Sequence, residues 1–385
     1  MLRIGMFVDT YFPMIDGVIN VVHHYSTLLS EDEDFEVVVF CPKTQDKKYK
    51  DEFPYRVVRC KSVKIFFLDY CLPFPQLDRR FKKALKESNL DLVHIHSPFM
   101  VGEAGVRYAV KHRIPAIATL HSQFEQDFYR ATKSKCITKS LLRRVMKVFN
   151  RCDECFTVNP AVARIFYDYG AKKMPSILQN CADLAPSPDP EGARERINEK
   201  YALAPETSVL LFVGRMTALK NIYFLADALA KLRTENYKMV FIGDGQDLNA
   251  LKKRVQERGI ADKVVFLGTV ADREELRDWY CRAKLFLFPS VYDTNSLVQL
   301  EAASQNTPTV FVEGAATAAS VTDRVNGFIA PATPEGYAEA VDEILSDDEL
   351  YESVRKNVKR DLYRTWEDTV KELKQVYFRL CDKNE

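Results

Sequence analysis

Residues 288–309 read FPSVYDTNSLVQLEAASQNTPT. The stretch begins at the end of an apolar run, 284–288, that has the length of a strand, and Pro289 breaks this strand. Asn295 or Ser296 can cap the helix that follows. A strand, a polar loop and a helix N-terminus, in this order, form the kind of mouth where open α/β sheets bind ligands. The stretch therefore predicts an α/β fold with a ligand site at this point.

Two carboxylates are positioned to contact a ligand in this opening. Asp293 lies in the loop, and Glu301 follows in the helix. Helical side chains lean toward the N-terminus, so both acids are expected to face the same opening. Such a pair can accept hydrogen bonds from a polyol such as a sugar. The alternative is that Asp293 belongs to a turn and Glu301 is a solvated helix residue, and the spacing alone leaves both interpretations open.

The composition is that of a globular protein with unevenly distributed charge. The 385 residues, 46% apolar and 28% charged, suffice for two α/β domains. Residues 1–180 carry a net charge of +8 and residues 181–365 a net charge of −6. We therefore expect only the first half to meet an anionic partner.

The chain shows no signal peptide, and no apolar run approaches the roughly 20 residues of a membrane-spanning helix. We expect a cytoplasmic protein. Its nine cysteines fit reduced thiols, and the single C-x-x-C, Cys152 and Cys155, is interpreted as incidental.

Strand-length apolar runs alternate with amphipathic helices along both halves, and the pattern restarts after a loop rich in Pro and acidic residues at 182–190. The alternation predicts two doubly wound parallel sheets, one in residues 1–180 and one in residues 181–365. Two such domains are expected to enclose a cleft.

A phosphate-binding element is predicted in the second half. Residues 214–221, GRMTALKN, follow a strand and start a helix, and Arg215 and Lys220 flank the helix N-terminus. Helix dipole, guanidinium and ammonium together suit a diphosphate. The alternative is a pair of ordinary surface cations. No G-x4-G-K-[ST] motif is present, which argues against a P-loop ATPase.

In the first half, Gly17 follows the first strand and opens a helix, where backbone can approach an anion closely, although a simple tight turn is an equal alternative. His94, His96 and His121 end two further strands. Period-two alternation turns His94 and His96 to one face. A zinc site would need further ligands, and we interpret His94 as a hydrogen-bonded core residue.

Residues 130–151, RATKSKCITKSLLRRVMKVFNR, are predicted to form a basic amphipathic helix. Its apolar side chains face either the domain core or an anionic membrane surface. The apolar loop 63–75, with Phe66, Phe67 and Phe74, is a second candidate contact or part of an acceptor channel.

Residues 293–308 resemble the E-x7-E region of the retaining glycosyltransferases of family four, which have the GT-B fold and read E-x-F-G-L-x-x-x-E-A-x-A-x-G-x-P. This chain reads DTNSLVQLEAASQNTP, so the second acid, the Ala after it and the Pro match. The first acid is shortened to Asp293, Phe-Gly becomes Asn-Ser, and the helix-ending Gly becomes Asn306, an acceptable residue there. Residues 214–221 resemble the family's G-R-x4-K-N element, and MFVDTYFPMIDGV at 6–18 resembles its first loop.

The resemblance implies a role for each candidate residue. Arg215 and Lys220 would stabilise the leaving diphosphate, Glu301 would hold the ribose, and Asp293 would hold the sugar's hydroxyls. His121 would lie near the donor sugar and the acceptor. From their own positions in the sequence, His96 is a candidate neighbour of His121, and Phe66 and Phe67 are candidates on the acceptor side. The remaining donor-binding positions would be Gly17, Gly214, Gly243, Gly268, Val270, Asn295, Ser296 and Leu297.

The implied activity is retaining transfer of a hexose, glucose first, from a UDP-linked donor to a hydroxyl, with no metal, no cofactor and no nucleic acid. The opening loop, HIHSPF at 94–99 and the basic helix look most like diacylglycerol glucosyltransferases, which implies a lipid acceptor and peripheral contact with the inner face of the membrane. The domains would be 1–180 with a C-terminal crossover helix in 366–385, and 181–365.

Two other function classes stay open. Asp293 and the absent Phe-Gly fit a nucleotide-sugar-binding or regulatory protein without turnover, and the same fold also serves sugar-nucleotide hydrolases and epimerases. The shorter acid leaves sugar identity the least determined property.

Overall fold

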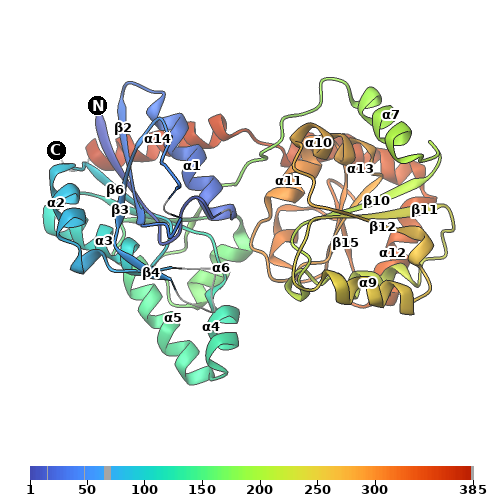
Figure 1. Cartoon of the computed structure of the whole chain (residues 1–385), viewed down its shortest axis with the longest axis horizontal. Helices are drawn as coiled ribbons and strands as arrows, with labels where there is room; N and C mark the ends of the chain where they lie inside the picture. The colour runs from blue at the N-terminus through green and yellow to red at the C-terminus, as the bar shows by residue number, and fades with distance from the viewer. Residues whose placement is uncertain (15, 47, 65–70, 383–385) are drawn as a thin grey trace. The chain divides into compact units, whose positions relative to one another are not determined.

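The computed structural model describes residues 1–14, 16–46, 48–64 and 71–382. The chain divides into two compact units, Met1–Asn180 with Thr365–Glu385, and Cys181–Arg364. Each unit contains one parallel sheet with helices packed around it (Figure 1). The predicted class, α/β with two doubly wound parallel sheets, is confirmed.

The sheet of the first unit has the order β3-β2-β1-β6-β7-β8-β9. Parallel strands covered on both faces form continuous buried runs, and β6 and β7 are buried at every position. The strands are β1 (Leu2–Phe7), β2 (Phe35–Pro42), β3 (Arg56–Cys60), β6 (Leu92–Ile95), β7 (Ala116–Leu120), β8 (Glu154–Thr157) and β9 (Ser176–Ile177), with a separate antiparallel pair, β4 (Ser62–Lys64) and β5 (Cys71–Pro73). The helices are α1 (Gly17–Ser30), α2 (Arg79–Glu87), α3 (Met100–His112), α4 (Phe124–Thr132), α5 (Lys135–Phe149), α6 (Pro160–Asp168) and α14 (Trp366–Asp382).

The sheet of the second unit has the order β12-β11-β10-β13-β14-β15. Its core lies on both faces, because alternate residues of β10 pack into different apolar clusters: Leu210 and Phe212 into one, Val209 and Leu211 into the other. The strands are β10 (Ser208–Val213), β11 (Tyr237–Ile242), β12 (Val264–Gly268), β13 (Leu285–Phe288), β14 (Thr309–Val312) and β15 (Phe328–Ala330). The helices are α7 (Pro190–Tyr201), α8 (Ile222–Leu229), α9 (Leu248–Glu257), α10 (Arg273–Arg282), α11 (Leu297–Ser304), α12 (Pro334–Ser346) and α13 (Asp348–Leu362).

In both sheets the strand order reverses beside the first strand. β1 lies between β2 and β6, and β10 lies between β11 and β13. At such a switch point the loops that follow the two central strands diverge and leave a crevice for a ligand. The stretch 288–309 begins at one of these points, because it contains the end of β13 and the loop after it.

The C-terminal helix α14 packs against α1 of the first unit. Tyr377 places its hydroxyl 2.8 Å from Nδ1 of His94, and Lys374 places Nζ 2.6 Å from the carboxylate of Asp32. A buried hydrogen bond and a half-exposed ion pair thus fix this helix to its unit.

Two predicted segments differ from the structure. The single basic helix expected at 130–151 is wrong, because the segment forms two helices. Helix α4 ends at Thr132, Lys133 adopts left-handed backbone with φ of +52, and Ser134 caps α5 with its side chain. Helix α7 was not predicted, because only Ala193 and Ile197 of its residues are buried.

Candidate active site

The loops after β10 and β13 meet at the switch point of the second sheet. Asn221, in left-handed backbone with φ of +58, donates from Nδ2 to the carbonyl oxygen of Pro289 at 3.1 Å. Lys220 places Nζ 2.6 Å from Oδ1 of Asp293. The predicted phosphate-binding cation and the predicted sugar-binding acid are therefore direct neighbours.

Asp293 uses one carboxylate oxygen in this ion pair. Its Oδ2 is buried and has no hydrogen-bond partner in the part of the chain that the structure describes. The pair is well shielded, since the Lys220 and Asp293 side chains are 15% and 17% exposed. A buried polar atom is normally hydrogen-bonded, so the described residues lack a donor for this oxygen, and a hydroxyl group is the kind of donor that would satisfy it.

Arg215 lies on the same loop as Lys220 and is exposed. The carboxylate of Asp247 accepts from the Ala218 N–H of this loop at 2.7 Å, and Lys220 is paired with Asp293. Arg215 is therefore the cation of this loop that no described acid pairs with, and it favours an anion at the end of β10.

Glycines let the loops after β10 and β11 approach each other closely. A Cβ on Gly243 would lie 2.0 Å from the carbonyl oxygen of Gly214, and φ of Gly243 is +129. The N–H of Gly243 donates to the carbonyl oxygen of Gly268 at 2.7 Å. Val270 is half-buried and packs on the apolar core. The ends of β10, β11 and β12 are therefore neighbours at the positions predicted to bind the donor.

Glu301 is buried inside the second unit rather than solvated. Arg273 donates to Oε1 at 2.9 Å and Tyr280 donates to Oε2 at 3.0 Å. Burial raises the pKa of Glu301, and the guanidinium of Arg273 opposes the rise. The interpretation of Glu301 as a solvated helix residue is wrong, and the two acids have different partners: Lys220 for Asp293, and residues of α10 for Glu301.

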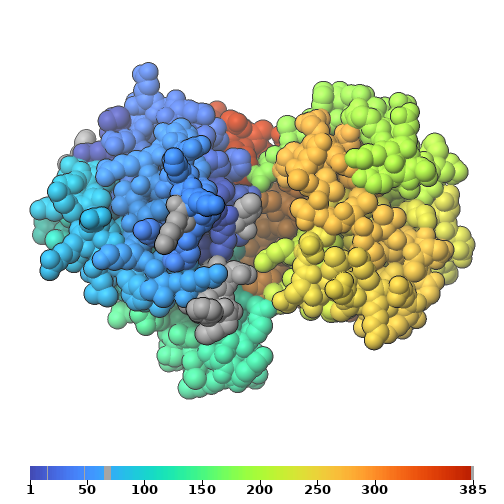
Figure 2. Space-filling model, viewed as in Figure 1, coloured from blue at the N-terminus to red at the C-terminus, as the bar shows by residue number. Residues whose placement is uncertain are grey.

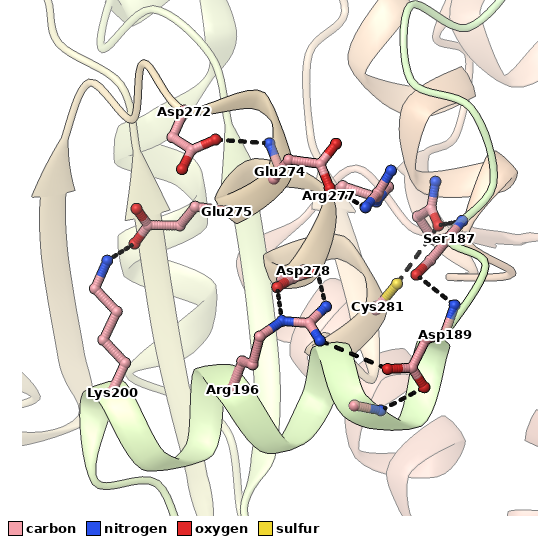
Figure 3. Close-up of polar contacts among 12 residues, drawn as sticks. Ser187, Asp189, Arg196, Lys200, Asp272, Glu274, Glu275, Arg277, Asp278 and Cys281 are labelled. Carbon is pink, nitrogen blue, oxygen red and sulfur yellow. Dashed lines mark hydrogen bonds and ion pairs between the residues drawn. The ribbon is translucent and has the colours of Figure 1, made fainter.

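Helix α10, which carries both donors to Glu301, is itself fixed by α7 (Figure 3). Arg196 of α7 donates twice to the carboxylate of Asp278, at 2.7 and 2.9 Å, and Lys200 pairs with Glu275 at 2.7 Å (Figure 3). The bidentate geometry of the first pair resists rotation of one helix against the other. Helix α7, which was not predicted from the sequence, therefore holds in place the helix that carries both donors to Glu301.

The start of α11 has no side-chain cap. Ser296 occupies the N-cap position but makes no capping hydrogen bond, and Oδ1 of Asn295 instead accepts from Gln299 at 2.8 Å. Leu297 is the first residue of the helix. At the other end, Asn306 adopts φ of +58, as predicted for a residue in place of Gly.

In the first unit, Gly17 and Asp9 follow the carboxyl end of β1. Asp9 was not singled out in the sequence analysis. Gly17 is exposed, and no atom lies within 4 Å of the position that its Cβ would take. Asp9 is buried after β1 and accepts hydrogen bonds from Ser97 Oγ at 2.6 Å and Val101 N–H at 2.7 Å. Burial raises the pKa of Asp9, and these donors oppose the rise. The sequence feature that could have identified Asp9 is a single acidic residue just after a buried strand.

The three histidines separate into one core residue and one pair. His94 lies between Tyr377 OH at 2.8 Å and Thr119 Oγ1 at 2.7 Å, so its interpretation as a hydrogen-bonded core residue is confirmed. His96 lies 4.1 Å from it, centroid to centroid, on the same face. Nδ1 of His96 lies 3.1 Å from Nε2 of His121. Among the described residues, no three His, Cys, Asp or Glu side chains are grouped to hold a metal ion.

Comparison with known proteins identifies the family. The models of glycosyltransferase family 4 and of glycosyl transferases group 1 match residues 15–186 and 193–361. The alpha-monoglucosyldiacylglycerol synthase of Streptococcus pneumoniae is 31% identical over 319 residues, which cover 80% of this chain and 70% of that protein. The chain belongs to the retaining glycosyltransferases of family four. The glycosyltransferase is also 26% identical to the alpha-monoglucosyldiacylglycerol synthase of Acholeplasma laidlawii, over 80% of each chain.

The fold of this family-four glycosyltransferase is GT-B. The Anabaena protein HepE, solved in complex with UDP, matches it with a TM-score of 0.78 at 16% identity, over 99% of this chain and 100% of that one. In the described residues of the glycosyltransferase, no helix combines the length and apolar character needed to cross a bilayer. Phe66 and Phe67, predicted on the acceptor side, lie outside the described residues.

Proposed function

We propose that this glycosyltransferase moves glucose from UDP-glucose, with retention, to a hydroxyl of a membrane lipid such as diacylglycerol. The observation that carries the proposal is the Lys220–Asp293 ion pair at the switch point of the second sheet, with Arg215 on the same loop. Cations for a diphosphate and an acid with an available oxygen for a sugar then lie side by side, as a nucleotide sugar requires.

Each group has a part in the reaction. Arg215 and Lys220 stabilise the charge that develops on the leaving diphosphate, and such preorganised electrostatics is usually the largest single contribution to catalysis. Asp293 accepts a hydrogen bond from a sugar hydroxyl, the uncapped start of α11 at Asn295–Leu297 offers backbone donors, and Glu301 accepts from the ribose.

The step needs no covalent nucleophile and no metal ion. The bond from the anomeric carbon to the phosphate oxygen breaks, the bond to the acceptor oxygen forms on the same face, and the acceptor's proton passes to the departing phosphate oxygen. His121, directly after β7, contacts the acceptor side of the substrate in this proposal. An unchanged rate in the presence of a chelator is the expected control.

The lipid acceptor is supported by the names of the two synthases that are 31% and 26% identical to this chain over the aligned residues, and by the charge of the first unit. UDP release from a panel of nucleotide sugars, with and without diacylglycerol vesicles, tests the proposal. We expect UDP only when donor and lipid are both present. UDP without lipid would indicate a hydrolase or epimerase, and nucleotide binding without UDP release would indicate a binding protein.

The α4–α5 hairpin is the proposed membrane contact. Both helices project from the rest of the first unit (Figures 1 and 2). Leu142, Val145 and Phe149 of α5 are buried, which confirms that most of its apolar side chains face the core. At the turn, however, Tyr129 and Ile137 are 45% and 51% exposed. The exposed cations of the hairpin, none of which has an ion pair to a described residue, are Lys133, Lys135, Lys139, Arg143, Arg144, Lys147 and Arg151.

Charge reversal on this hairpin is expected to release the protein from anionic vesicles. Lys135, Lys139 and Arg143 follow one another at i, i+4 and i+8 on one exposed face. Each contributes about 1 kcal/mol near an anionic surface. The triple change to Glu should therefore lower partitioning at least about a hundredfold, at about 1.4 kcal/mol per factor of ten.

Co-sedimentation with neutral and anionic vesicles at two salt concentrations measures this effect. Lys82, Lys83 and Lys86, exposed on α2, changed together to Glu, give a control with the same change in net charge. Salt should weaken wild-type binding, since screening acts beyond about 8 Å at physiological ionic strength. An equal loss of vesicle binding in both variants would contradict the proposed contact. Wild-type binding that does not depend on lipid charge would also contradict it.

A further inference from the structure

The pair formed by His96 and His121 has a geometry that limits where its protons lie. Nδ1 of His96 and Nε2 of His121 are 3.1 Å apart, and the ring planes differ by only 17°. Two ring nitrogens at this separation form an N–H···N hydrogen bond. One nitrogen must therefore carry a hydrogen and the other must present a lone pair.

The second nitrogen of His96 decides the direction of this hydrogen bond. Nε2 of His96 is buried and has no hydrogen-bond partner among the residues that the structure describes. An unpaired buried N–H is rarer in proteins than an under-satisfied acceptor. The hydrogen of neutral His96 therefore lies on Nδ1, which makes His96 the donor and Nε2 of His121 the acceptor.

We propose that His96 is a positioning residue that holds His121 in the Nδ1–H tautomer, so that His121 meets the substrate as a hydrogen-bond donor and not as a proton acceptor. This inference rests on the role of His121 in the proposed function. The atom that His121 would recognise is an oxygen lone pair, on a sugar hydroxyl or on a phosphate.

The surroundings of the pair favour neutral rings. Burial lowers the pKa of His121 to about 4, and burial with the neighbouring His94 lowers that of His96 well below its ordinary value. Both rings are therefore neutral near pH 7, where a group of such low pKa is a weak base.

The ring of His94 packs against that of His96 and limits its movement. The ring of His94 lies 4.1 Å from that of His96, centroid to centroid. His94 is fixed from two sides, by Thr119 of β7 and by Tyr377 of α14. The C-terminal helix thus supports, through His94, the orientation of the residue that positions His121.

Nitrogen NMR of the full-length protein carrying 15N-labelled histidine tests the tautomer directly. Long-range proton–nitrogen correlations identify which ring nitrogen is protonated, and the variants His121→Asn and His96→Asn assign the signals. We expect both His96 and His121 to carry the hydrogen on Nδ1 in the wild type. An Nε2–H signal for His121 would overturn the proposal.

Paired variants test the positioning role. The side-chain amide of Asn can replace the Nδ1 donor of His, whereas Leu cannot, so His96→Leu should lower kcat/KM about tenfold, the lower end of the loss for residues that orient a functional histidine. His96→Asn should retain most of the wild-type value. The exposed His112, changed to Leu, is the control.

In His96→Leu the His121 signals should also change to a mixture of tautomers. Equal kcat/KM for the Leu and Asn variants, or an unchanged His121 tautomer in His96→Leu, would overturn the positioning role. Failure of the wild type to transfer any sugar would instead count against the proposed function, while the wild-type tautomer would still be decided by NMR.

Discussion

Lys220→Ala is expected to lower kcat/KM by about two to three orders of magnitude, the scale of removing one group that stabilises the transition state. The ammonium lies 2.6 Å from Asp293 in a shielded site. Its removal takes away a charge that faces the diphosphate and also leaves a buried carboxylate without its partner, which is costly. Steady-state kinetics on folded protein measures the loss.

Arg215→Ala is expected to fall in the same range, and comparison of the two variants is informative. Arg215 is exposed and holds no described acid, so its loss should act only through the phosphates. In a double-mutant cycle, Lys220→Ala and Asp293→Asn should be non-additive, because they share one ion pair. Lys253, an exposed lysine of α9 paired with Glu257, gives a neutral Lys253→Ala control. If folded Lys220→Ala had wild-type kinetics, the assignment of Lys220 to the leaving diphosphate would be wrong.

Glu301→Ala is expected to lose UDP binding, whereas Asp293→Ala should keep it and lose discrimination among sugars. Glu301 is held in one orientation by Arg273 and Tyr280, and a hydrogen bond to a charged group contributes about 1.5–3 kcal/mol. Calorimetry with UDP should therefore show an affinity about ten- to a hundredfold lower for Glu301→Ala, at about 1.4 kcal/mol per factor of ten.

Stability must be measured beside affinity in this comparison. Glu301→Ala leaves the guanidinium of Arg273 and the buried hydroxyl of Tyr280 without their acceptor, so thermal unfolding of the second unit should also shift downward. Glu301→Gln keeps the shape and one acceptor oxygen and separates the two effects. Glu339→Ala, at an exposed position of α12, is the control. Equal loss of plain UDP affinity at positions 293 and 301 would contradict the division of roles.

Local sequence signals determined the class of fold and the places where ligand-binding loops occur. Apolar runs such as 285–288 match β13, and Asn306 ends α11 in left-handed backbone as its side chain allows. Helix α7 had a local signal as well, since Asp189 before Pro190 is a typical N-cap followed by Pro at the first position. Its sparse apolar residues concealed it from a search for periodicity.

The sequence by itself determined the alternating strands and helices, the glycines and cations at the strand ends, and the basic character of the first unit, because each depends on neighbours a few residues apart. Only the tertiary structure decided that Lys220 pairs with Asp293, that Arg273 and Tyr280 bury Glu301, and that His96 bonds to His121. These partners lie tens of residues apart. Spacing along a chain carries no information on which strand ends become neighbours, because strand order and burial set those contacts.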